Sequence, residues 1–181
     1  MPSSELELRH IGVMLLSFSM RRAVMDQRQR EQELNQWLSL QPPFESPDSR
    51  YSIRRATPEE YPQVYALVDE VWRRERPREQ YDWLYVDNPS GYARVTLVFE
   101  RSSGKMVAAS AGFPWPIAKG DTRCRGQFGG DTVTIERLQR QNIGDIRRAY
   151  AETHPWRNGT IGLGAPNEKS RAGAKKRGKP T

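Results

Sequence analysis

The stretch Thr132–Gly144, with the sequence TVTIERLQRQNIG, decides the fold prediction. Its β-branched residues predict a strand, the polar residues that follow predict a loop, and a helix is expected to begin at Ile143. In such a turn, the loop amides and the positive end of the helix dipole point at one spot, as in a pyrophosphate site. Arg140 lies in this turn and can add charge-assisted hydrogen bonds. The stretch therefore predicts a site for a phosphorylated ligand.

The segments around this stretch predict mixed helices and strands. The sequence TPEE at Thr57–Glu60 has a capping threonine, a proline at the first helical position and a glutamate that completes a capping box. The residues from Tyr61 to Trp72 carry an apolar stripe with helical period. The other expected elements are strands over 51–56, 94–100, 105–117, 127–135 and 160–165, and helices over 80–86 and 142–153. This order is typical of an α/β (α+β) domain with mixed strand pairing.

The first 49 residues predict an extension, with the domain itself over residues 50–181. Residues 21–40 contain good helix formers, but Asp26–Glu33 has no apolar face, and three prolines between 41 and 49 indicate a linker. The apolar segment Ile11–Met20 is only ten residues long, too short to span a bilayer. The segment before it is acidic, unlike the start of a signal peptide.

Charge and cysteine content narrow the classes of function. The net charge is +7, and residues 137–181 hold eleven Lys/Arg and three Asp/Glu, so 11 − 3 = +8. A concentrated basic surface suits nucleic acid, membrane phosphate or a phosphorylated cofactor, and charge alone does not choose among them. The single cysteine, Cys124, excludes an internal disulfide, and no zinc-type spacing exists. We expect a cytoplasmic protein without a metal site.

The loop of the opening stretch resembles the acetyl-CoA-binding signature of the GNAT superfamily of N-acetyltransferases, Q/R-x-x-G-x-G/A. Gln139 takes the first position, Asn142 the first glycine and Gly144 the last. Asparagine is the best substitute for glycine where a left-handed backbone is required.

A second family motif, N-x-x-A-x-x-x-Y-x-K-x-G-F, is matched less closely. Asn167, Ser170, Lys176 and Gly178 fall at the matching offsets, while Ala174 and Lys179 stand at its aromatic positions. The resemblance covers roughly residues 51–178. It implies a mixed, mostly antiparallel central sheet flanked by helices. The family continues with two further strands, so we expect the fold to be incomplete after the fifth strand and the start of the fourth helix. An uncovered sheet edge would then favour a homodimer.

The resemblance implies acetyl-CoA as co-substrate and direct attack by an unidentified primary amine. It makes Asp131 the first candidate for the catalytic base and Glu136 the second. The strand Thr132–Thr134 would bind the oxyanion through a backbone N–H. The expected cofactor contacts are Thr132, Val133, Thr134, Gln139, Arg140, Gln141, Asn142, Ile143, Gly144, Asn167 and Ser170.

Other functions and roles stay open at this point. The chain could be a catalytically impaired relative that serves as a non-enzymatic binding or subunit fragment. A nucleic-acid-binding module ranks last because basic and aromatic residues do not interleave. A carboxylate such as Asp131 is more often a turn or strand-edge residue than a base. Asn167 suits a helix cap as well as a cofactor contact.

Overall fold

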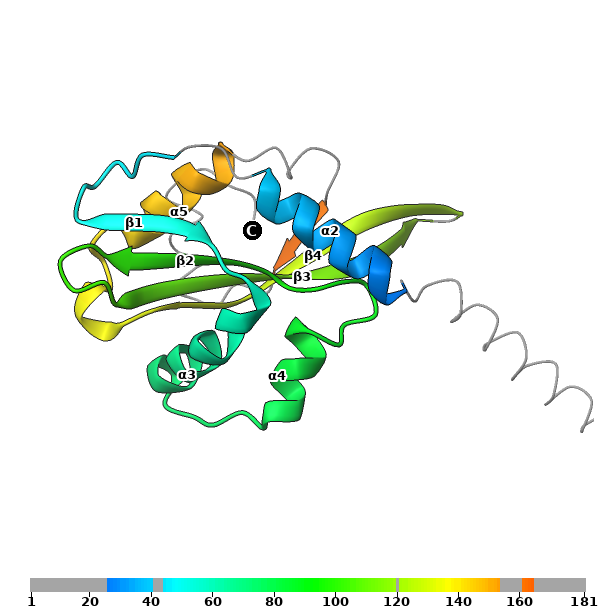
Figure 1. The fold of residues 1–181 in the computed structure, drawn as a ribbon, viewed down its shortest axis with the longest axis horizontal. Helices are drawn as coiled ribbons and strands as arrows, with labels where there is room; N and C mark the ends of the chain where they lie inside the picture. Colours follow the sequence, from blue (N-terminus) through cyan, green and yellow to red (C-terminus); the bar gives the residue numbers. More distant parts are fainter. Residues whose placement is uncertain (1–25, 41–43, 120, 154–160, 165–181) are drawn as a thin grey trace, which may run out of the picture.

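Five strands form one sheet in which the order of the strands is the order of the chain. The structure is a computed structural model and describes residues 26–40, 44–119, 121–153 and 161–164 (Figure 1). Antiparallel pairs join β1 (Tyr51–Arg55), β2 (Arg94–Glu100), β3 (Met106–Lys119) and β4 (Thr122–Thr134). β5 (Ile161–Gly164) pairs parallel with β4. The predicted mixed, mostly antiparallel sheet is confirmed.

Helices lie on both faces of this sheet (Figure 1). One face carries α3 (Tyr61–Trp72) and α4 (Arg78–Tyr85), and the other carries α5 (Ile143–Glu152). Helix α2 (Gln27–Ser39) lies on the α5 side. Two short 3₁₀ turns, Pro58–Glu60 and Glu136–Leu138, precede α3 and α5. Each face therefore has its own apolar cluster.

The start of α3 forms as its sequence predicts. The Glu60 carboxylate accepts a hydrogen bond of 3.0 Å from the Thr57 backbone N–H, completing the capping box. The predicted apolar stripe is mostly buried, but Trp72 is 39% exposed. Tyr65 is buried instead, because its ring stacks on Tyr81 of α4 with centroids 4.3 Å apart.

Alternation in β1 places Tyr51, Ile53 and Arg55 on one buried face. There Tyr51 and Ile53 join Ile143, Ile146 and other residues of the α5 cluster. Arg55 lies over the ring of Trp37 at 4.5 Å, which attaches α2 to the sheet. Trp37 is also buried, so α2 contacts the domain even though the boundary at residue 50 stays a prediction.

β3 and β4 are longer than expected. β4 begins at Thr122, before the predicted start at Gln127, because its ladder with β3 continues to Lys119. Pro114 and Pro116 stand in the part of β3 beyond its last β2 partner, as expected for prolines at an open side. In the described residues, β5 pairs only with β4, and its Leu163 is 46% exposed. The homodimer through this edge stays a prediction.

No helix among the described residues is long and apolar enough to cross a membrane.

Candidate functional site

The end of β4 has an open edge. β5 pairs with Gly126–Gly129 of β4, and β4 then continues to Thr134. Within the described ranges, Gly130–Thr134 therefore has a strand neighbour on the β3 side only. We call this segment the open edge of β4. Its backbone groups on the side away from β3 face no strand among the described residues and can reach a ligand.

A β-bulge lies in this open edge. Ala111 pairs with Gly130 but Ala109 pairs with Val133, so β4 holds an extra residue here. Asp131 has a φ of 42°, a left-handed conformation that is uncommon outside glycine. Opposite it, the hydroxyl oxygens of Ser110 and Thr132 lie 3.1 Å apart. The bulge leaves Asp131 and Thr132 out of register with β3, whereas Val133 and Thr134 pair with it again.

The predicted base Asp131 lies in a buried network. Its side chain is 5% exposed, and Arg76 donates to both carboxylate oxygens at 2.8 and 2.9 Å. The Tyr85 hydroxyl donates to the same carboxylate at 3.0 Å. Burial, together with the Asp131 charge, raises the pKa of Tyr85 well above its ordinary value. Hydrogen bonding to Asp131 raises the pKa of Arg76. Both oxygens of Asp131 are thus engaged.

The second predicted base, Glu136, lies on the surface. Arg73 donates to it at 3.1 Å, and both side chains are more than 80% exposed, at 81% and 83%. Exposed pairs of this kind contribute little to stability. Both predicted carboxylates therefore contact arginines of the α3–α4 connection, Arg73 and Arg76, which sequence reasoning missed. The only local signal is the basic run RRERPR at 73–78.

The loop between β4 and α5 contains two left-handed residues, Arg140 and Asn142, with φ of 69° and 61°. Asn142 is the N-cap of α5, and its side chain makes no capping hydrogen bond. The backbone N–H groups of Asn142, Ile143 and Gly144 have no hydrogen-bond acceptor in the described part of the chain. A Cβ added to Gly144 would meet nothing within 4 Å. Free amides beside open space fit a phosphate group.

Side chains of this loop also contact the end of β4. The Gln139 amide donates to the Thr134 carbonyl at 3.3 Å, which joins two members of the predicted set. Gln139, Arg140, Gln141 and Asn142 are exposed, whereas Ile143 is buried at 2% and anchors the helix. Asn167 and Ser170 lie outside the described residues.

Arg147 of α5 brings a positive charge to the bulge. Its guanidinium donates to the carbonyls of Ala109 at 3.0 Å and Val133 at 3.2 Å. No carboxylate pairs with it in the described ranges, and burial lowers its pKa to about 10. This role of Arg147 has no local signal in the sequence, because position 147 lies next to the apolar stripe of α5. In the same described ranges, no group of three His, Cys, Asp or Glu could hold a metal ion.

Comparisons with known proteins were made by sequence and by structure. No protein-family model matches the sequence, and no curated protein matches it significantly. Solved structures do match. A predicted acetyltransferase with acetyl-CoA from Clostridium acetobutylicum aligns with a TM-score of 0.57 and 12% identity, over 72% of this chain and 90% of that chain. Glucosamine-6-phosphate N-acetyltransferase from Arabidopsis thaliana aligns with a TM-score of 0.52 and 12% identity, over 72% of this chain and 92% of that chain. The chain has the GNAT fold.

A third GNAT-type neighbour is much larger. A probable N-acyltransferase from Enterococcus faecalis aligns with a TM-score of 0.56 and 12% identity, over 70% of this chain. The present chain spans 31% of that protein. At such identities the likeness concerns the GNAT fold alone, so the function must be argued from this chain's own residues.

Proposed function

We propose that this chain binds acetyl-CoA at the β4–α5 loop and transfers the acetyl group to a primary amine. The observation that carries the proposal is the meeting of free amides at the start of α5 with the open edge of β4. The GNAT fold of the chain and of its acetyltransferase neighbours supports it.

The residues that would hold the co-substrate follow from this arrangement. The amides of Asn142, Ile143 and Gly144 would bind the pyrophosphate, with Arg140 adding positive charge. Gln139 and Gln141 flank these amides. Thr132, Val133 and Thr134 would lie along the thioester arm. Acetyl-CoA supplies the activated acetyl group.

The chain's own groups would act on the transfer in two ways. A backbone N–H of the open edge would stabilise the developing oxyanion, because the bulge leaves Asp131 and Thr132 out of register with β3. Arg147 would add a positive field through the peptide groups that it contacts. The amine nitrogen forms a bond to the carbonyl carbon, the carbon–sulfur bond breaks, and the thiolate takes up a proton.

The base that takes the amine proton stays a prediction. Asp131 would have to leave Arg76 and Tyr85 in order to accept it. Glu136 needs no such step, because its one ion pair is exposed. The engaged state of Asp131 also favours a second candidate function, a binding protein without turnover.

Thermal unfolding with increasing acetyl-CoA tests the proposal. A ligand that binds the folded state stabilises it by about 2.7 kcal/mol at a hundred times its Kd. We expect Gly144→Glu to abolish the rise in midpoint, because the new carboxylate would face the phosphates. Gln32→Glu adds the same charge on exposed α2 and should keep the rise.

Turnover separates the two candidates. Release of free thiol with a panel of primary amines would support the transferase. Binding without release for every amine would support the non-enzymatic protein. A cooperative transition that acetyl-CoA does not move would exclude both.

A further inference from the structure

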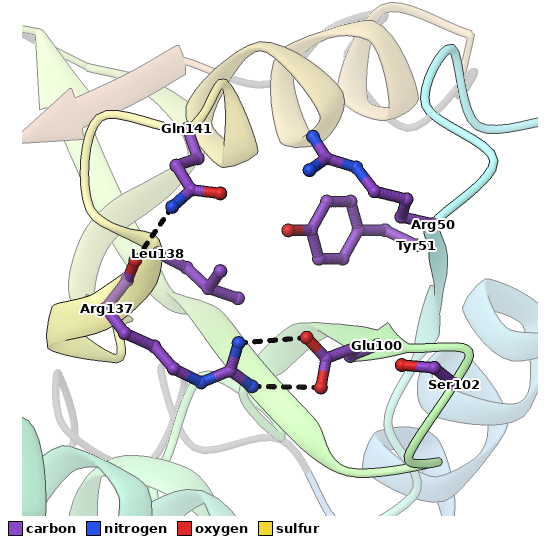
Figure 2. Close-up of a pocket in the computed structure, with 7 residues that line it drawn as sticks. All are labelled: Arg50, Tyr51, Glu100, Ser102, Arg137, Leu138 and Gln141. Atoms are coloured by element: carbon purple, nitrogen blue, oxygen red, sulfur yellow. Dashed lines mark hydrogen bonds and ion pairs between the residues drawn. The ribbon is translucent and has the colours of Figure 1, made fainter.

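A hollow lies between the start of β1, the end of β2 and the connection from β4 to α5. It has a volume of about 390 Å³ and is found where β1 begins and β2 ends (Figure 2). Its walls are Arg50, Tyr51, Glu100, Ser102, Arg137, Leu138 and Gln141. β1 and β4 are separated by two strands, and only Gln141 is shared with the proposed acetyl-CoA contacts. The hollow therefore needs its own explanation.

The Tyr51 hydroxyl is the main sign of a ligand. The side chain is only 2% exposed, and its hydroxyl makes no hydrogen bond within the described residues. Figure 2 shows this hydroxyl directed into the hollow, toward Leu138 and away from the backbone of β1. The hydroxyl is not among the buried unpaired polar atoms of the described residues, so it opens onto the hollow, where it can donate to a ligand acceptor.

Two arginines border the hollow, Arg50 and Arg137, and each has a guanidinium nitrogen that makes no hydrogen bond in the described residues. Arg50 uses Nε and Nη2 to bind Asp48, which leaves Nη1 without a partner in the described ranges. Its side chain is 63% exposed and lies over the Tyr51 ring at 5.3 Å. Arg137 uses Nη1 and Nη2, each at 2.9 Å from Glu100 (Figure 2), and keeps Nε.

The one carboxylate of the hollow is already neutralised. Both Glu100 oxygens accept from Arg137, and the Ser103 hydroxyl also donates at 2.8 Å. These hydrogen bonds lower the pKa of Glu100 and keep it ionised. The polar groups left for a ligand are thus mainly donors, from Arg50, Tyr51 and Ser102, beside the apolar side chain of Leu138.

We propose that this hollow binds a small organic anion, with a phosphate or carboxylate group at Arg50 and Tyr51 and its carbon body along Leu138. The volume lies within the range of small-molecule sites, about 300–1,000 Å³. Charge-assisted hydrogen bonds from a guanidinium and a phenol are the contacts that such an oxyanion requires. The proposal stands whether or not acetyl-CoA binds at the loop.

Isothermal titration at constant ionic strength tests it, with phenyl phosphate and benzoate as probes and benzyl alcohol as the neutral control. We expect saturable binding of at least one anion and none of the alcohol. The anion that binds more tightly identifies which oxyanion the hollow prefers.

Two variants locate the binding. Tyr51→Phe removes only the hydroxyl and should raise the Kd about tenfold or more, as expected for a hydrogen bond to a charged group. The same variant should fold at least as stably as the parent in the absence of ligand, because its hydroxyl has no partner to lose. Arg50→Gln should also weaken binding, whereas Arg28→Gln on exposed α2 should not.

Several results would overturn the proposal. These are no saturable binding of either anion, an unchanged Kd in Tyr51→Phe, or equal losses in Arg50→Gln and Arg28→Gln. Binding that is lost in Gly144→Glu but kept in Tyr51→Phe would place the anion at the β4–α5 loop instead.

Discussion

Arg76 and Asp131 form a two-pronged ion pair across 55 positions of sequence, with distances of 2.8 and 2.9 Å. The pair fastens the α3–α4 connection to the bulge of β4. Arg76 is itself held, because its backbone N–H donates to Asp69 at 3.2 Å and its guanidinium lies 4.4 Å from the Tyr81 ring. A left-handed aspartate inside a strand is thus supported from a helix pair on one face.

Removing the cation of this pair should destabilise the fold strongly. Arg76→Gln leaves Asp131 buried without its counter-charge, at 5% side-chain exposure. We expect a loss of about 3–5 kcal/mol in the free energy of unfolding, measured with urea. Arg74→Gln, in the same exposed basic run, should change it by less than about 0.5 kcal/mol.

The double variant Arg76→Gln with Asp131→Asn checks the cause. Since neither charge then stays buried alone, it should lose less than the sum of the single variants. Additive losses would show that the two side chains act independently.

Alkaline pH should unfold the protein through its tyrosines. Tyr61, Tyr65, Tyr81 and Tyr85 pack ring to ring, and burial raises the pKa of each above its ordinary value. The unfolded chain releases these protons near pH ~10 while the folded chain keeps them. Their contribution to stability is therefore complete below pH ~10 and is lost as the pH rises further.

Arg147 opposes this trend, because burial lowers its pKa to about 10 on folding, and stability rises as the buried guanidinium releases its proton. It is one group against several tyrosines. We expect tyrosinate absorbance to appear together with unfolding in a pH titration. Gradual tyrosinate formation in a protein that stays folded would contradict this expectation.

The left-handed residue Asn142 should tolerate only a narrow set of replacements. Its φ is 61°. Asn142→Val should cost about 1–2 kcal/mol, because a β-branched side chain clashes in this conformation, whereas Asn142→Gly should be close to neutral. Thermal unfolding of the two variants measures the difference, and equal midpoints would mean that the loop changes conformation.

Gly126 in β4 should not accept a side chain. A Cβ there would lie 2.3 Å from the Ile117 Cδ1 atom and 2.7 Å from the Trp115 carbonyl oxygen, and backbone cannot move cheaply. Gly126→Ala should therefore destabilise by about 1–3 kcal/mol. Gly162→Ala in the neighbouring β5 is the control, because its Cβ would meet nothing within 4 Å. Similar midpoints for both variants would refute the steric account.

Helices and strands whose ends are marked by short sequence patterns were predicted correctly. β2 has the predicted bounds, 94–100, since β-branched alternation runs directly into a glycine turn. Asn142 marks the start of α5 because few other residues adopt its backbone conformation. The early part of β4, residues 122–126, escaped prediction, because Gly126 lowers strand propensity there and pairing with β3 overrides it.

The candidate site was predictable only in part. The loop around Asn142 could be found because its residues are contiguous. The partners of Asp131 could not, since Arg76 and Tyr85 reach it from α3–α4 across the sheet. Burial of Tyr51 beside a hollow likewise depends on the 3₁₀ turn Glu136–Leu138 reaching β1, a contact without a local pattern.

Because the strands lie in the sheet in the same order as in the chain, the sheet can fold in the order of synthesis. Each strand from β2 to β5 pairs with the strand that precedes it, so a chain emerging from the ribosome can add strands one at a time. Antiparallel hairpins close short loops and form early, while the parallel β4–β5 pair must await α5. The β4–β5 pair, which lies next to the open edge of β4, should thus form last in folding.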